Sequence, residues 1–121
     1  MIKILHVDDE DDIREIARMS LELDPEFEVA SAASGELALE IVSRDQPDLL
    51  LLDVMMPGMD GPETLRRIRM MAGFADVPAI FMTARSRPQD IDQLLGEGAR
   101  AVIAKPFDPM ALAGQLRAHL F

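Results

Sequence analysis

Short apolar runs alternate with amphipathic segments five times along the 121-residue chain. A short apolar run bounded by turn residues predicts a buried strand, and apolar positions three or four residues apart predict a helix. The predicted strands cover residues 2–7, 27–32, 49–53, 79–82 and 101–104. The run of four leucines before Asp53 is apolar throughout, which is typical of a strand buried on both faces.

A helix is predicted after each strand. Ser34 is placed to cap the second helix, and Pro62 suits the first turn of the third. The apolar side chains expected to face the sheet are Ile13, Ile16, Ala17 and Leu23, then Leu37, Ala38, Ile41 and Val42, then Leu65 and Ile68, then Ile91, Leu94 and Leu95, and finally Leu112, Leu116 and Leu120.

Five strand–helix units with short connections predict an α/β fold with an open, five-stranded parallel sheet and five helices on its two faces, a doubly wound arrangement. At this length, we expect residues 1–121 to form a single domain.

The amino-acid composition argues against several classes of function. The net charge of −10 disfavours direct nucleic acid binding, because a phosphate backbone would repel this surface. The absence of cysteine excludes disulfides and Cys-ligated zinc. The N-terminal residues do not resemble a signal peptide, and no apolar stretch is long enough to span a membrane, so we expect a cytoplasmic protein.

Polar residues follow four of the five predicted strands. Asp8 and Asp9 follow the first strand, Asp53 ends the third, Thr83 follows the fourth and Lys105 follows the fifth. Because ligands of open parallel sheets bind outside the carboxyl ends of the strands, these side chains are expected at one functional edge.

Three crowded carboxylates need a counter-charge, and a site with oxygen ligands alone suits Mg²⁺. The metal and Lys105 together would neutralise the charge of Asp8, Asp9 and Asp53. A phosphoryl group could then be transferred to Asp53, since ionised Asp is a nucleophile and this reaction mainly needs positioning and charge neutralisation.

Each of these residues also has an ordinary structural interpretation. Acidic residues 8–12 could be a solvated helix start, which we favour for Glu10, Asp11 and Asp12. Asp53 alone could begin a turn, Thr83 could cap a helix and Lys105 could be a surface lysine. His6 in the first strand is expected to pack in the core, and His119 to end the last helix. The joint placement at one edge favours function.

Four segments carry a family resemblance: residues 7–10, 52–61, 83–84 and 104–107. With these motifs the chain resembles, from end to end, the receiver domain of response regulators in two-component signalling. The resemblance implies the flavodoxin-like strand order 2-1-3-4-5. It also implies a signalling switch, not a conventional enzyme, although such domains catalyse their own phosphorylation and dephosphorylation.

The resemblance implies that Asp53 accepts a phosphoryl group from a histidine kinase or a histidine phosphotransfer protein. It implies that Asp9 ligates Mg²⁺ directly and Asp8 largely through water, with Asp53 and the Met55 backbone carbonyl as further ligands.

Two further residues acquire roles from the same resemblance. Thr83 would donate a hydrogen bond to a phosphoryl oxygen, and Lys105 would pair with another. The family also implies a cis peptide bond between Lys105 and Pro106.

The chain departs from the family pattern in the fifth strand. Val102 occupies a position where Tyr or Phe is common, so an aromatic switch is excluded there. Arg100 and Ala101 replace acids that support a shared dimer mode, so we expect a monomer or a weak dimer. Met55 and Arg85, two residues after Asp53 and Thr83, occupy positions that the resemblance implies would influence how water reaches a phosphoaspartate.

Other functions remain open at this stage. The alternative is a binding module with the receiver fold that acts independently of phosphorylation. An aspartyl phosphatase would need an acid at Met55, and a dinucleotide enzyme would need a Gly-rich turn after the first strand. The downstream target could be a separate protein, as in chemotaxis, or a fused output domain.

Overall fold

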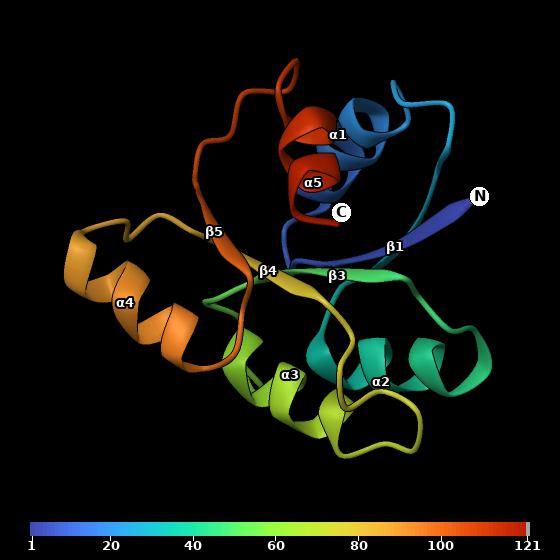
Figure 1. The fold of residues 1–121 in the computed structure, drawn as a ribbon, viewed down its shortest axis with the longest axis vertical. Coiled ribbons are helices and arrows are strands. Elements are labelled where there is room, and N and C mark those ends of the chain that lie inside the picture. The colour runs from blue at the N-terminus through green and yellow to red at the C-terminus, as the bar shows by residue number, and fades with distance from the viewer. Residues whose placement is uncertain (121) are drawn as a thin grey trace.

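A computed structural model describes residues 1–120, which form five strands and five helices in strict alternation (Figure 1). The predicted strand bounds are confirmed, except that the fourth strand extends one residue further, to Thr83. The strands are β1 (Ile2–Val7), β2 (Phe27–Ala32), β3 (Leu49–Asp53), β4 (Ala79–Thr83) and β5 (Ala101–Ala104), and the helices are α1 (Asp11–Leu21), α2 (Gly35–Arg44), α3 (Gly61–Arg69), α4 (Pro88–Gly96) and α5 (Leu112–Leu120).

All neighbouring strands pair in parallel, in the order β2-β1-β3-β4-β5. The expected strand order and the doubly wound topology are therefore confirmed. Since β1 and β3 occupy the centre of the sheet with β4, their carboxyl ends lie side by side at one edge. The polar residues that follow the strands lie at that edge.

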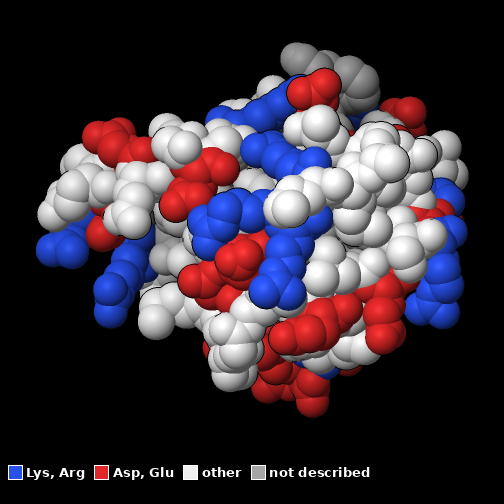
Figure 2. Space-filling view, turned by 90° about the horizontal axis from the view of Figure 1, so that it is seen from below, with Lys and Arg blue, Asp and Glu red and all other residues white. Residues whose placement is uncertain are grey.

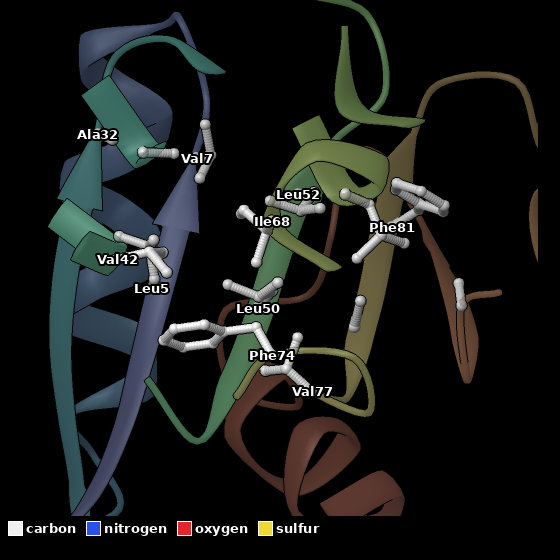
Figure 3. Close-up of a cluster of buried hydrophobic side chains, with 14 of the residues drawn as sticks. Leu5, Val7, Ala32, Val42, Leu50, Leu52, Ile68, Phe74, Val77 and Phe81 are labelled. Carbon is white, nitrogen blue, oxygen red and sulfur yellow. The ribbon is translucent and has the colours of Figure 1, made fainter. Parts of the chain in front are cut away.

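The helices form two layers, one on each side of the sheet. In Figure 1, α1 and α5 lie above the sheet, whereas α2 and α3 lie below it, with α4 on the outer side near β5. The core under α2, α3 and α4 contains Leu50, Leu52 and Phe81, and Figure 3 shows Phe81 and Ile68 pointing into it. The opposite core, under α1 and α5, contains Leu51 and Met82. The apolar β3 run thus supplies both cores, as expected for a strand buried on both faces.

Local sequence explains where two helices begin. The Ser34 hydroxyl accepts a hydrogen bond from the Leu37 amide at the start of α2, which confirms the predicted cap. At the start of α3, the Asp60 carboxylate accepts from the Glu63 amide, and Pro62 lies in the first turn as predicted.

Four of the side chains predicted to face the sheet are exposed. Leu23 is 61% exposed, because α1 ends at Leu21 and the chain turns there towards β2. Leu37 is 45% exposed, because Ala38 and Val42 are the α2 residues that face the sheet. Ile16 and Leu95 are also more than one-third exposed, since they lie at the margins of their helices' buried faces.

The surface carries charges of both signs. Figure 2 views the molecule from the side of α2 and α3 and shows basic and acidic side chains interleaved. Arg66 of α3, for example, pairs with Glu63 and with Glu97 at the end of α4. Within residues 1–120, no helix has the length and apolar character needed to cross a bilayer.

Candidate functional site

Strand register brings the predicted site residues to one edge of the sheet. Val7 pairs with Leu52 and Asp53 pairs with Met82, so Asp8, Asp53 and Thr83 begin the carboxyl edge at nearly the same level. Thr83 pairs with Ala104, which places Lys105 at the next position beyond β5. The prediction that these residues share an edge is confirmed.

The Lys105 ammonium group links two carboxylates at this edge. Its Nζ lies 2.8 Å from Asp8 Oδ2 and 3.1 Å from Asp53 Oδ1. Asp8 is fully buried and Asp53 is 5% exposed, so both interactions form away from bulk water. The Coulomb attraction between these groups is stronger there than on the surface, because little water screens it. Lys105 therefore joins the ends of β1, β3 and β5 electrostatically.

Asp8 is further fixed by the start of α1. Its Oδ1 accepts a hydrogen bond from the Glu10 amide at 2.9 Å, and its backbone carbonyl accepts one from the Arg14 guanidinium at 2.8 Å. These contacts leave the Asp8 side chain little rotational freedom.

Asp9 and Glu10 extend the acidic group towards solvent. Oxygen atoms of Asp8, Asp9 and Glu10 lie within 4.8 Å of one another, and the last two residues are exposed. We assigned Glu10 to a solvated helix start from the sequence alone, so its place beside the metal-binding candidates was missed. The Asp–Asp–Glu run was the available signal.

The donor set fits a hard divalent cation. Carboxylate oxygens are the ligands that Mg²⁺ prefers, and one lysine cannot neutralise Asp8, Asp9 and Asp53 together. Asp8 and Asp9 could hold the ion with Asp53 and the Met55 backbone carbonyl. The exposed side of the cluster would leave room for the waters that Mg²⁺ usually retains.

The pKa of Asp53 reflects this crowding. Burial and the neighbouring Asp8 carboxylate raise the pKa of Asp53 from 3.8 to about 6, although hydrogen bonding to Lys105 opposes the shift. Asp53 is consequently still mostly ionised at neutral pH, and a bound cation would lower its pKa again. The pKa of Lys105 is also changed: burial lowers it, but the hydrogen bonds to Asp8 and Asp53 outweigh burial and raise it.

Thr83 is buried at the end of β4 and begins the loop to α4. Its hydroxyl oxygen accepts a hydrogen bond from the Arg85 amide at 3.0 Å, so the side chain also organises that loop. The hollow beside Thr83, between α3 and α4, is lined by Val54, Met55, Arg85, Gln93 and Leu94.

The turn after β3 depends on glycine. Gly58 has a φ of 76°, a backbone conformation that residues with a Cβ rarely adopt. A Cβ on Gly61 would collide with the Asp53 carbonyl oxygen, so glycine allows α3 to begin directly against the end of β3. This close approach helps to fix the backbone of the proposed acceptor.

Two features near β5 agree with the sequence analysis. The peptide bond between Lys105 and Pro106 is cis, as the resemblance implied. Val102 is half-buried, pairs in register with Phe81 and packs against the core under α2, α3 and α4.

His6 is buried as expected, but its environment was not foreseen. Neither imidazole nitrogen has a hydrogen-bond partner among the described residues, and Nε2 lies 3.9 Å from Asp8 Oδ2. The available signal was strand alternation, which puts residues 6 and 8 on the same face of β1.

Comparison with known proteins identifies the family. The profile of the response regulator receiver domain matches residues 4–117. The chain belongs to this family. It is therefore a receiver domain of the two-component response-regulator type, a class of signalling switch.

Similar proteins support the same assignment. The chain is 44% identical over 119 residues to the transcriptional regulatory protein YvrH of Bacillus subtilis, covering 97% of this chain and 48% of that protein. It is 38% identical to the phosphate regulon transcriptional regulatory protein PhoB of Pseudomonas aeruginosa, covering 97% of this chain and 51% of that one. The chain thus spans about half the length of these curated relatives.

The fold also matches solved receiver structures. Chemotaxis response regulator CheY4 of Vibrio cholerae superimposes with a TM-score of 0.90 at 32% identity, covering 98% of each chain. A putative response regulator from Chloroflexus aurantiacus gives a TM-score of 0.89 at 33% identity, covering 98% of this chain and 97% of the other.

Proposed function

We propose that the domain accepts a phosphoryl group on Asp53 in a Mg²⁺-dependent reaction and thereby changes its protein contacts. The observation that carries this proposal is the Lys105 ammonium group held between Asp8 and Asp53 at the carboxyl edge of the sheet. Two buried acids, an exposed third acid and a buried hydroxyl surround that position.

The donor would be a phosphohistidine of a histidine kinase or a histidine phosphotransfer protein. An Asp53 carboxylate oxygen forms the new P–O bond while the P–N bond to the histidine breaks. The departing imidazole nitrogen keeps the electron pair and is protonated. Mg²⁺, when bound, would stabilise the negative charge on the phosphoryl oxygens.

Lys105 and Thr83 would position the transferred group. Lys105 already lies 3.1 Å from Asp53 Oδ1, so a small movement would bring its ammonium to a phosphoryl oxygen. The Thr83 hydroxyl, which now accepts from the Arg85 amide, would donate to a second oxygen. A rearranged Thr83 would move the loop before α4 and so alter the surface offered to a partner. That partner would be either a separate protein or a fused output domain.

The test is phosphorylation by a small donor. We would incubate the protein with Mg²⁺ and acetyl phosphate and record its intact mass, expecting the gain of one phosphoryl group. Asp53→Asn and excess chelator should each abolish the gain, and Asp9→Asn should reduce it. Asp12→Asn is the matched control, because Asp12 is an exposed acid of α1 outside the cluster and its loss should have no effect.

A short-lived phosphoaspartate could escape detection by mass. Beryllofluoride, a stable phosphoryl analogue, should then bind to the wild-type protein in the presence of Mg²⁺ and not to Asp53→Asn. Failure of both phosphorylation and beryllofluoride binding would contradict the proposal and favour a binding module that acts independently of phosphorylation.

A further inference from the structure

The residues directly beneath the site differ in polarity. Alternation along the strands places His6 beneath Asp8, Leu51 beneath Asp53 and Ile103 beneath Lys105, on the face covered by α1 and α5. All three are buried, and Leu51 and Ile103 belong to the apolar core of that face. Among them, His6 alone carries polar side-chain atoms.

The two His6 nitrogens destabilise the folded state in this position. His6 is fully buried, and both its nitrogens lack a hydrogen-bond partner within residues 1–120. A buried polar atom without a partner destabilises the folded state, whereas a leucine in this layer would not. Packing alone therefore does not account for an imidazole at this position.

The imidazole has one potential acceptor nearby. His6 Nε2 lies 3.9 Å from Asp8 Oδ2, about 1 Å beyond an ordinary hydrogen bond. That oxygen is already held by Lys105 Nζ at 2.8 Å. An imidazole carries a proton on one ring nitrogen in either neutral tautomer, so the ring can donate a hydrogen bond from Nε2.

We propose that His6 is a positioning residue. When Lys105 moves to a phosphoryl group on Asp53, His6 replaces it as the hydrogen-bond donor to Asp8 Oδ2. In this step Nε2–H approaches Asp8 and donates the hydrogen bond that Lys105 leaves. His6 thus keeps the buried Asp8 carboxylate oriented for Mg²⁺ in the phosphorylated state. The inference rests on the proposed function, because it needs a phosphoryl group to attract Lys105.

A spectroscopic experiment tests the new hydrogen bond directly. The chain has two histidines, and the exposed His119 provides an internal reference for histidine labelled with ¹⁵N. On addition of Mg²⁺ and beryllofluoride, the His6 Nε2–H proton should shift downfield and exchange more slowly with water. The His119 signals should stay where they are.

Variants separate positioning from packing. His6→Leu should raise the thermal unfolding midpoint, because it removes two unsatisfied polar atoms, yet weaken beryllofluoride binding about 3- to 10-fold, the equivalent of one hydrogen bond. His6→Gln retains an N–H donor and should restore most of the affinity. Ile103→Val, a change in the same layer, should lower the unfolding midpoint and leave beryllofluoride affinity unchanged.

The outcomes distinguish this inference from the proposed function. If wild-type protein binds beryllofluoride while the His6 signal stays unchanged and His6→Leu binds equally well, the positioning role is wrong and the proposed function stands. If wild-type protein does not bind beryllofluoride at all, the proposed function fails and the role of His6 fails with it.

Discussion

The middle of the sheet and its carboxyl edge are built on opposite principles. In the middle, Leu50, Leu51 and Phe81 are fully buried among apolar neighbours. At the edge, the same strands bury Asp8 and Asp53 with Lys105 between them. Burial of apolar surface stabilises a fold, whereas burial of charges commonly costs stability even when they are paired. The interior therefore supports an edge whose arrangement favours chemistry over stability.

Weakening the apolar interior should cause the greatest loss of stability. Phe81→Ala should cost about 3–5 kcal/mol of unfolding free energy, because it opens a large cavity under α2, α3 and α4. Urea denaturation measures this loss. Leu95→Ala is the control, since Leu95 is 40% exposed and its truncation should cost far less. Similar losses in the two variants would contradict the contrast between interior and surface.

The second-greatest loss of stability should come from removing the Lys105 ammonium group at the carboxyl edge of the sheet. Lys105→Met should cost about 3 kcal/mol in the absence of divalent cations, because it leaves two buried carboxylates without their counter-charge. Millimolar Mg²⁺ should restore part of the loss by supplying positive charge at the same place. Urea denaturation with Mg²⁺ and with chelator provides the comparison. A loss that Mg²⁺ does not change would show that Lys105 acts through packing.

Substitution of the proposed acceptor, Asp53, should raise the unfolding free energy instead of lowering it. Asp53 has its pKa raised from 3.8 to about 6, so between these values the unfolded chain releases a proton that the folded protein retains. Ionisation of Asp53 therefore destabilises the fold progressively as pH rises from about 4 to 6, and fully above that range. Asp53→Asn should add about 1–2 kcal/mol of stability at pH 7, less than the full pKa shift implies, because the buried asparagine amide also needs hydrogen-bond partners.

The dependence of this stability gain on pH tests whether its cause is electrostatic. The stability gained by Asp53→Asn should vanish below about pH 4, where Asp53 is protonated in both states, and should shrink in Mg²⁺. Thermal unfolding from pH 3.5 to 8 measures both trends. A gain that is constant with pH would indicate a packing effect and would contradict the electrostatic account of the edge.

The same contrast explains what the sequence could predict. The leucine run before Asp53 predicted a strand buried on both faces, since the run is too short for a buried helix and is followed by a turn rich in Pro and Gly. The helix surfaces were harder, as Leu23 and Leu37 show: both fit the helical spacing, yet α1 ends before Leu23 and the sheet does not reach Leu37. Periodicity gives a helix an apolar side, but packing decides how wide that side is.

The edge was predictable in its members and not in its contacts. The order of strands and helices alone predicted that Asp8, Asp53, Thr83 and Lys105 would meet at the carboxyl ends of their strands. The difference between a buried Asp8 under Lys105 and an exposed Asp9 depends on the direction of side chains at the end of β1. The unsatisfied nitrogens of His6 likewise depend on what α1 and α5 place above it, which no local pattern encodes.

An exposed ion pair should contribute least to stability, and it can be compared directly with the buried pair of Lys105 and Asp8. Arg66 and Glu97 link α3 to α4 at 2.9 Å, nearly the same distance that separates Lys105 from Asp8. Their side chains are 50% and 31% exposed, so water and salt screen the attraction. Arg66→Met should therefore leave the urea midpoint unchanged at physiological salt, in contrast to Lys105→Met. A comparable loss in both variants would show that distance, not burial, determines the strength of ion pairs in this protein.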